Sequence, residues 1–537
     1  MMQFQLTITP ILERAGSLFP DVEIVSRMPD GSIHRQKYRD FYRRARALAA
    51  ALQAAGLRPG DRVATLMWNH YVHLEAYFGI PTVGGILHTL NLRLHPDELV
   101  YIINHAQDRF LIVDDVLLGL FEQIQDRVKF DRVFVVSLTH NKVPDCYDSY
   151  ESVLDQSNGE PNYPVLDEND AAGICYTSGT TGRPKGVSYS HRALVLHSFS
   201  ISLPDNFAIG RKDCVLTTMS MFHANGWGLP YAATMNGAKH VFPGPNTQPE
   251  VLLELMETEQ VTLTGGVPTI WLGVLEALER HPKRWKLASD LRIVIAGSAA
   301  PESIFRRFAK FGMRVIHAWG LSETTPIATV STLKKKMESW SDDQKYQVRA
   351  TQGLPSPFVE IRTVGDTGET PRDGKTPGEL QVRGPWIAAS YLNLPAEQDK
   401  WTEDGWFRTG DVATIDAEGY IKITDRIKDL IKSGGEWISS VDVENALVGH
   451  TAVKEAAVVA VAHPKWRERP LAIVVLKHDA EVTPADLRAF LAAKFAKWQI
   501  PDAFVFVEEL PHTSTGKLLK SKLREQFANW EWNVNSC

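Results

Sequence analysis

Apolar stretches of strand length alternate with helix-length segments through the first half of the chain. Five apolar side chains recur at helical spacing in residues 39–56 and predict a helix that Gly56 ends: Phe41, Ala45, Leu48, Ala49 and Leu52. Apolar strands are predicted at 62–67, 110–113, 132–136, 214–217, 261–264 and 292–296. Helix-length segments such as 250–256 separate these strands. This alternation predicts doubly wound α/β layers.

The pattern changes from about residue 350, where glycine and proline divide the chain into short segments typical of an antiparallel β lobe. A further unit starts near Asp425. Its apolar strands at 456–461 and 471–476 and its helix at 484–494, which Thr483 caps, predict a small α+β domain. The predicted fold class is therefore α/β, with a large N-terminal domain of doubly wound layers plus a β lobe, and a small C-terminal α+β domain.

Charge and cysteine content exclude two classes of protein. The chain has 58 Lys and Arg residues against 64 Asp and Glu, a formal net charge of −6. This excludes a nucleic-acid binder held by bulk positive charge. The four cysteines show no C-x-x-C spacing, so neither a disulfide framework nor a zinc site is indicated. A reducing, cytoplasmic setting is expected.

Two apolar regions resemble targeting or membrane segments only superficially. The N-terminus reaches Glu13 and Arg14 before a long apolar run develops, so it lacks the layout of a secretory signal. Residues 214–238 are uncharged, but Pro230 and several polar residues interrupt them where a membrane span would be apolar. We interpret this stretch as protein interior.

The strongest chemical signal is the loop at residues 176–186, YTSGTTGRPKG. Its glycines allow backbone N–H groups to turn toward phosphate oxygens, its hydroxyls add donors, and Lys185 adds a compact positive charge. The loop contains no Gly-Lys-Ser/Thr and is therefore not a Walker A motif. A Ser/Thr/Gly cluster is more often a surface turn, but the length of this pattern favours a polyphosphate site.

Four further stretches add complementary chemistry. Residues 317–324 offer an aromatic plane, a hydroxyl and a carboxylate able to hold Mg²⁺, and residues 406–411 end in an acid suited to ribose hydroxyls. Residues 425–436 join a charged run to a glycine pair, and residues 513–517 place Lys517 on a flexible tip. Each stretch alone is more often structural. Their order and joint presence favour one nucleotide site.

Together these motifs resemble the adenylate-forming superfamily, which includes acyl-CoA synthetases, acetyl-CoA synthetase, firefly luciferase and the adenylation domains of peptide synthetases. The resemblance covers nearly the whole chain and is closest to bacterial medium- and long-chain fatty-acyl-CoA synthetases, through residues 222–227, 384–386 and 432–440. It implies an N-terminal adenylation domain (1–424), a hinge (425–429), a mobile C-terminal domain (430–537) and a homodimer formed through the N-terminal domain.

The resemblance also implies a role for each matched position. Its catalytic groups are Lys517, Lys185 and Glu323, and its Mg²⁺ ligands are Thr177 and Glu323. The positions around the polyphosphate are Ser178, Gly179, Thr180, Thr181 and Gly182. The adenine, α-phosphate and ribose positions are Gly297, Ser298, Ala299, His317, Ala318, Trp319, Ser322, Asp411 and Arg426. Lys428 matches the hinge pivot, and Lys432 and Trp437 match further cofactor positions. The acyl site is matched by Phe222, His223, Trp227 and Gly297.

Trp319 stands where the family more often has Tyr, and Ser322 where it more often has Thr. Both keep the required plane or hydroxyl, so we expect altered nucleotide affinity and retained activity.

The implied activity is adenylation of a carboxylic acid, expected to be a medium- or long-chain fatty acid, with ATP and Mg²⁺, followed by acyl transfer to coenzyme A with release of AMP and pyrophosphate. The alternatives are a ligase for a short acid such as 3-(methylthio)propionate and an adenylating enzyme with another acceptor. A non-enzymatic nucleotide sensor could lose Lys517, Glu323 and Asp411, yet all three are present. The expected partners are the acid and coenzyme A, without nucleic acid and with at most peripheral membrane contact.

Overall fold

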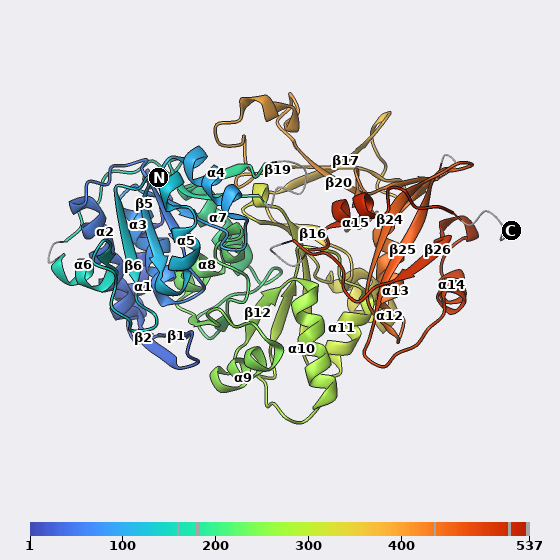
Figure 1. Cartoon of the computed structure of the whole chain (residues 1–537), viewed down its shortest axis with the longest axis horizontal. Helices are drawn as coiled ribbons and strands as arrows, with labels where there is room; N and C mark the ends of the chain where they lie inside the picture. The colour runs from blue at the N-terminus through green and yellow to red at the C-terminus, as the bar shows by residue number, and fades with distance from the viewer. Residues whose placement is uncertain (158–159, 178–182, 434–435, 514–516, 533–537) are drawn as a thin grey trace.

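The computed structural model describes residues 1–157, 160–177, 183–433, 436–513 and 517–532. Among these residues, three β-sheets form the large N-terminal domain and a fourth forms the smaller C-terminal domain (Figure 1). In Figure 1 the chain passes from the first lobe, in blue, to a second in green and a β lobe in gold, and ends in the red C-terminal domain.

The first lobe is built on a seven-stranded sheet with the order β7-β6-β5-β3-β4-β8-β9. All neighbouring strands are parallel except β8 and β9. The strands are β3 (Arg62–Leu66), β4 (Ile86–Thr89), β5 (Asp108–Asp114), β6 (Arg132–Val136), β7 (Asp148–Ser149), β8 (Ala171–Tyr176) and β9 (Gly186–Ser190). The helices of this part of the chain are α1 (Thr9–Leu18), α2 (Tyr38–Ala54), α3 (Tyr71–Thr82), α4 (Pro96–Ala106), α5 (Leu118–Glu122) and α6 (Tyr150–Gln156).

The second lobe contains a nine-stranded sheet with the order β16-β15-β14-β13-β12-β10-β11-β1-β2. Its central strands are parallel. The strands are β1 (Glu23–Arg27), β2 (Ile33–Lys37), β10 (Cys214–Leu216), β11 (Lys239–Phe242), β12 (Leu263–Gly266), β13 (Arg292–Ile295), β14 (Arg314–Gly320), β15 (Ile327–Val330) and β16 (Leu354–Pro355). The helices are α7 (His191–Ser202), α8 (Leu229–Asn236), α9 (Pro249–Glu259), α10 (Pro268–Arg280), α11 (Glu302–Ala309) and α12 (Asp342–Arg349).

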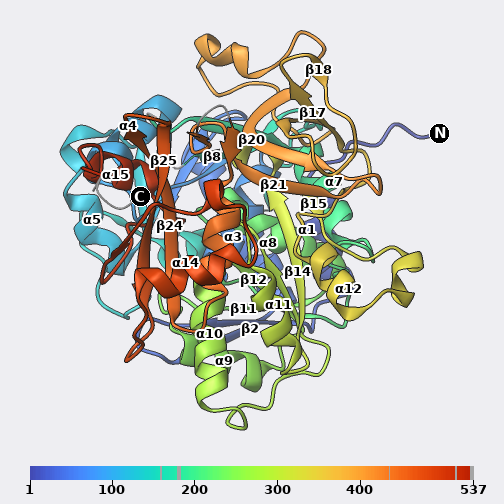
Figure 2. The ribbon, with the colours of Figure 1, turned by 90° about the vertical axis from the view of Figure 1, so that its right-hand side faces the viewer.

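The β lobe and the C-terminal domain complete the chain (Figure 2). The β lobe is an antiparallel sheet in the order β18 (Gly368–Glu369), β17 (Glu360–Gly365), β19 (Gly378–Arg383), β20 (Phe407–Ile415) and β21 (Ile421–Arg426). The C-terminal sheet has the order β23 (Glu436–Ile438), β22 (Ile431–Ser433), β25 (Arg467–Leu476) and β24 (Val453–His463), with β26 (Ala503–Phe506) also paired to β25. Its helices are α13 (Ser440–Val448), α14 (Pro484–Ala492) and α15 (Lys520–Gln526).

The observed fold class agrees with the prediction, and most predicted elements lie within one or two residues of the observed ones. The strand predicted at 261–264 is observed later, as β12 at 263–266, because Gln260 caps α9 in a left-handed conformation and Val261 N–H donates back to Met256. The uncharged stretch 214–238 is largely buried, as predicted.

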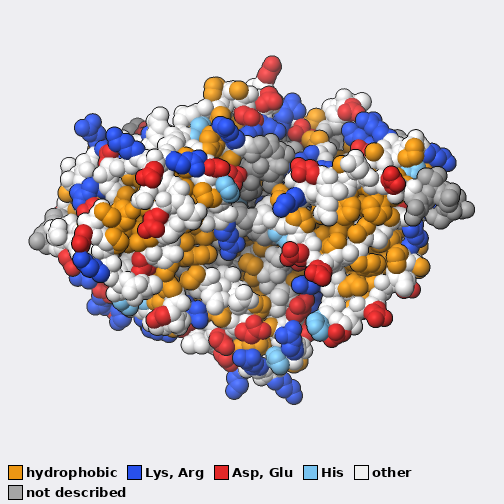
Figure 3. Space-filling model, in the orientation of Figure 1, with side chains coloured by type: hydrophobic (Ala, Val, Ile, Leu, Met, Phe, Trp, Pro, Cys, Tyr) orange, Lys and Arg blue, Asp and Glu red, His pale blue; other side chains and the backbone are white. Residues whose placement is uncertain are grey.

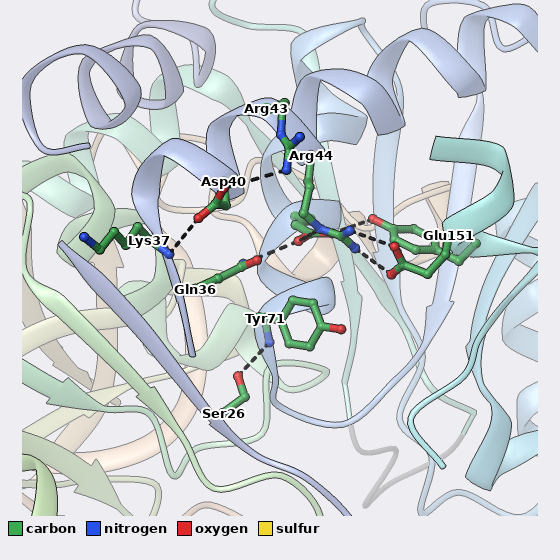
Figure 4. Close-up of polar contacts among 10 residues, drawn as sticks. Ser26, Gln36, Lys37, Asp40, Arg43, Arg44, Tyr71 and Glu151 are labelled. Carbon is green, nitrogen blue, oxygen red and sulfur yellow. Dashed lines mark hydrogen bonds and ion pairs between the residues drawn. The ribbon is translucent and has the colours of Figure 1, made fainter. Parts of the chain in front are cut away.

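A partly buried ion-pair network joins α2, α3 and α6 (Figure 4). Arg44 donates to both carboxylate oxygens of Glu151 at 2.7 Å and, through Nε, to Glu75 at 2.7 Å. Burial raises the pKa of Glu75, while the Arg44 charge opposes this shift. Because Glu75 is fully buried, loss of Arg44 would leave its carboxylate desolvated and without a counter-ion.

On the face in Figure 3, basic and acidic side chains are interspersed. Within the described part of the chain, every helix falls short of the length and apolarity that crossing a bilayer requires.

Candidate active site

A cavity of about 470 Å³ lies where the lobes meet the C-terminal domain. Most of the sequence-predicted site residues that the structure describes line this cavity. They are Thr177, Lys185, His223, Trp227, Gly297, Ser298, Ala299, His317, Ala318, Trp319, Ser322, Glu323, Asp411, Arg426, Lys428 and Lys517. The fold therefore gathers at one site groups that are up to 340 positions apart in sequence, since 517 − 177 = 340.

The two ends of the predicted polyphosphate loop are tied together. The N–H of Thr177, directly after β8, donates to the carbonyl of Lys185 at 2.9 Å, and the N–H of Lys185 donates to Oγ1 of Thr177 at 3.1 Å. The antiparallel β8–β9 pair, in which Tyr176 lies opposite Gly186, thus brings Thr177 and Lys185 together. The expected phosphate contacts Ser178, Gly179, Thr180, Thr181 and Gly182 lie outside the described residues.

Glu323 and Lys185 have partners on the segment between β19 and β20. The Tyr391 hydroxyl donates to Oε1 of Glu323 at 2.5 Å, and the Lys185 ammonium lies 2.5 Å from a carboxylate oxygen of Glu397. Sequence reasoning missed both partners, because neither lies in one of the motifs that it singled out.

Asp411 is fixed by two donors. The Trp319 indole N–H donates to Oδ2 of Asp411 at 2.9 Å, and Nε of Arg426 lies 3.1 Å from Oδ1. The β20–β21 register places Asp411 opposite Arg426, and the Asp411 carboxylate raises the pKa of Arg426. Trp319, which stands where the family more often has Tyr, thus supplies a hydrogen-bond donor as well as an aromatic plane.

His317, in the middle of β14, is buried at the wall of the cavity. Its Nδ1 is 2.9 Å from the carbonyl of Ala350, and burial lowers its pKa to about 4, so the ring is neutral at physiological pH. Its buried Nε2 has no hydrogen-bond partner among the described residues. Because buried polar atoms are usually paired, Nε2 is a candidate contact for a ligand in this pocket.

Lys517 reaches the cavity from the C-terminal domain. A Cβ built on Gly297, whose φ is +89°, would lie 3.4 Å from Cε of Lys517, so the lysine passes directly over this glycine. Burial, with a smaller contribution from the Arg426 charge, lowers the pKa of Lys517 to about 8, while Asp411 and Glu323 oppose the shift. The C-terminal domain therefore holds a cation in the cavity, over Gly297.

One wall of the cavity is apolar and conformationally strained. Residues 224–228 follow His223 as a left-handed turn in which Ala224, Asn225 and Trp227 have φ of 44°, 53° and 57°. Such φ values are unfavourable for residues other than glycine and occur mainly at functional sites. The turn presents Trp227 near Gly297, and burial lowers the pKa of His223 to about 3. The His223 ring is therefore neutral at physiological pH, so neither it nor Trp227 brings charge to this wall.

Of the predicted residues that the structure describes, three do not line the cavity. Phe222, expected at the acyl site, packs in the core of the first lobe with its ring centroid 6.5 Å from that of Trp68. Lys432 and Trp437 lie opposite each other on β22 and β23, with the ammonium 4.7 Å from the ring centroid, and Trp437 is 49% exposed. In this arrangement of the domains, these two side chains are not among those that line the cavity.

The expected hinge carries contacts between the domains. Asp425, on β21, accepts hydrogen bonds from the N–H and hydroxyl of Ser440 at the start of α13, at 2.7 and 2.6 Å. Lys520 of α15 donates to Ser440 and pairs with Glu444 at 2.6 Å. The Asp425–Ser440 hydrogen bonds hold α13 against β21 and would have to break if the domain rotated, whereas the Lys520 contacts lie within the C-terminal domain and would move with it.

The donor set fits Mg²⁺ bound together with a polyphosphate. Thr177 offers a hydroxyl and Glu323 a carboxylate, and Mg²⁺ prefers oxygen ligands. Within the described residues, no group of three or more His, Cys, Asp or Glu side chains forms a cage for a metal. Proteins commonly bind Mg²⁺ in this way, through one or two carboxylates with substrate phosphates supplying further oxygens.

Comparison with known proteins agrees with this geometry. Residues 12–392 match the AMP-binding enzyme family, and residues 442–517 match the AMP-binding enzyme C-terminal domain. The chain is 51% identical to a long-chain-fatty-acid–CoA ligase of Thermus thermophilus over 99% of its length and 97% of that protein. It is 43% identical to a 3-methylmercaptopropionyl-CoA ligase of Ruegeria lacuscaerulensis over 98% of each.

A solved anthranilate CoA ligase, AuaEII, in complex with anthranoyl-AMP superposes with a TM-score of 0.86 at 25% identity and covers 98% of both chains. Because family models match residues 12–392 and 442–517 and a ligase is 51% identical over nearly the whole chain, the chain belongs to the AMP-binding enzyme family.

Proposed function

We propose that the protein is a fatty-acyl-CoA synthetase that activates a medium- or long-chain fatty acid in two steps. The observation that carries this proposal is the position of Lys517, over Gly297 and within the field of Asp411, Glu323 and Arg426. A cation there suits a reaction in which a carboxylate must approach the α-phosphate of ATP, because the two reactants are both anions.

In the first step, a carboxylate oxygen attacks the α-phosphorus of ATP and the bond to the bridging β-oxygen breaks. Acyl-adenylate forms and pyrophosphate leaves. Lys517 stabilises the negative charge on the carboxylate and α-phosphate oxygens. Lys185 stabilises the negative charge on the departing pyrophosphate. Thr177 and Glu323 would hold Mg²⁺, which supplies Lewis-acid stabilisation of phosphate oxygens when bound. Asp411 and the neutral His317 orient the nucleoside.

In the second step, the coenzyme A sulfur attacks the acyl carbonyl, the bond between the carbonyl carbon and the phosphate oxygen breaks, and AMP leaves. The thiol proton passes to solvent in this step. Lys517 fills one side of the cavity in the present arrangement, so we propose that rotation about residues 425–429 withdraws it before the thiol enters. The same rotation would bring Lys432 and Trp437 from the surface toward the site.

The apolar wall beside Trp227 supports an acyl substrate. Each buried CH₂ contributes about 0.8 kcal/mol, so an apolar tunnel behind this wall would favour longer acids. The 51% identity to a long-chain ligase favours the same substrate class. A short acid such as 3-(methylthio)propionate is the second candidate, because a 3-methylmercaptopropionyl-CoA ligase is 43% identical and the bulky Trp227 side chain lines the cavity, where it would limit the room for a long chain.

Four finer properties belong to the same proposal. Oxygen donors at Thr177 and Glu323 support Mg²⁺ as the metal. The family resemblance supports a homodimer formed through the N-terminal domain and coenzyme A as the acceptor. Cys146, Cys175 and Cys214 are free thiols, which supports a reducing cytoplasmic setting.

The two half-reactions test the proposal when measured separately on Lys517→Ala. We expect adenylate formation to fall by about a hundredfold or more, as for loss of a well-placed transition-state donor, while thioester formation from supplied acyl-adenylate survives. Wild-type enzyme and the exposed-lysine variant Lys522→Ala, from α15, serve as controls. Equal loss of both half-reactions would refute the assigned role of Lys517.

A further inference from the structure

The segment between β19 and β20 contacts both N-terminal α/β lobes at the phosphate end of the cavity. The N–H of Ala388 donates to the carbonyl of Glu323 at 2.8 Å. The N–H of Leu392 donates to the carbonyl of Gly186, next to Lys185, also at 2.8 Å. Two backbone hydrogen bonds, four residues apart, thus fix the β lobe to the second lobe beside Glu323 and to the first lobe beside Lys185.

Tyr391 lies between these two anchors and contacts both functional side chains. It is 7% exposed, its hydroxyl donates to Oε1 of Glu323, and the Lys185 ammonium lies 5.1 Å from its ring centroid. Burial, followed by the Glu323 charge, raises the pKa of Tyr391, so its hydroxyl stays protonated and donates. Trp401 packs against the ring with centroids 5.2 Å apart and restricts its position.

Glu397 lies on a 3₁₀ turn (Pro395–Lys400) a few residues further along and pairs with Lys185. The two side chains are 24% and 33% exposed, so the pair is partly desolvated. A carboxylate oxygen 2.5 Å from the ammonium occupies the coordination space that a phosphate oxygen would take. Glu397 therefore competes with any polyphosphate that Lys185 is to bind.

We propose that Tyr391 and Glu397 are positioning residues of the phosphate site: Tyr391 orients the Glu323 carboxylate, and Glu397 holds Lys185 in the nucleotide-free enzyme and yields it to ATP. The exchange is electrostatically favourable because the triphosphate carries more negative charge than one carboxylate. The Tyr391 ring contacts Lys185 in either state. The inference rests on the proposed function only in assigning ATP to this cavity.

Equilibrium binding of Mg-ATP, measured by calorimetry without acid or coenzyme A, tests the role of Glu397. Loss of the competing carboxylate in Glu397→Gln should lower Kd by about twofold to fivefold, the range expected for a partly exposed ion pair. Glu403→Gln makes the same charge change at an exposed position nearby and should leave Kd unchanged. Unchanged or weaker binding by Glu397→Gln, or equal tightening in both variants, would overturn this role.

The Mg²⁺ dependence of the same binding reaction tests the role of Tyr391. Tyr391→Phe keeps the ring and removes the donor to Glu323, so the Mg²⁺ concentration that half-saturates ATP binding should rise about tenfold, while affinity at saturating Mg²⁺ stays near wild type. Tyr391→Leu, which also removes the ring, should in addition weaken binding at saturating Mg²⁺. A melting temperature close to wild type for Tyr391→Phe confirms folding.

An unchanged Mg²⁺ dependence in the folded Tyr391→Phe variant would overturn its role. Acid and coenzyme A are absent from these experiments. An enzyme that binds Mg-ATP as described but activates no acid would therefore contradict the proposed function and leave this inference standing.

Discussion

The lowered pKa of Lys517 predicts a pH dependence of the first half-reaction. Only the ammonium form stabilises the two meeting anions, so activity is present below the pKa of Lys517 and is lost as pH rises through it. With that pKa at about 8, the protonated fraction falls from about 0.9 at pH 7 to about 0.1 at pH 9. Because kcat/KM reports the pKa values of the free enzyme, kcat/KM for ATP should fall about tenfold over this range.

The assay is pyrophosphate release under hydroxylamine trapping of the adenylate, from pH 6.5 to 9.5, with a fatty acid at saturation. Lys517→Arg is the matched control, because a guanidinium stays charged throughout and should give a lower but flat profile over pH 7–9. A wild-type profile that is flat to pH 9.5, or the same decline in Lys517→Arg, would refute the reasoning.

Four further predictions follow from particular contacts. Trp319→Phe removes the donor to Asp411 and should raise KM for ATP about tenfold or more without changing KM for the acid. Trp227→Ala should shift the acid chain-length optimum upward; an unchanged optimum would contradict its place on the acyl wall. Arg44→Met should lower the free energy of unfolding of the N-terminal domain by about 3–5 kcal/mol in urea titrations, with the exposed Arg43→Met as control. Lys428→Pro fixes φ in the hinge and should retain adenylation while losing thioester formation; wild-type rates in both would contradict the hinge.

The sequence predicts the α/β layers well because parallel strands buried on both faces are continuous apolar runs, as at 110–113 and 292–296. Element ends are less predictable where a local cap decides them. The left-handed cap at Gln260 moved β12 by two residues, and no residue-type signal for it stands in the sequence. The turn at 224–228 carries Asn225, Gly226 and Gly228, which accept positive φ, but nothing there predicts that Trp227 also adopts it.

The chemical groups of the site were predictable as motifs, whereas the contacts between them were not. The Trp319–Asp411 hydrogen bond joins residues 92 positions apart, and the Lys185–Glu397 pair joins residues 212 apart. Such pairs depend on how the lobes pack. Phe222 shows that a motif match does not guarantee a place in the site, because its side chain packs in the core of the first lobe and does not line the cavity. Lys432 and Trp437 make the same point, since both match motif positions and neither lines the cavity in this arrangement of the domains.

The central claim is tested most directly by AMP formation by the purified protein with Mg-ATP, across straight-chain acids from acetate to oleate plus 3-(methylthio)propionate, with and without coenzyme A. We predict AMP release that depends on coenzyme A and is greatest with a medium- or long-chain acid. An optimum at acetate or 3-(methylthio)propionate would contradict the proposed substrate class, and turnover that is independent of coenzyme A, or absent with every acid, would contradict the proposed function itself.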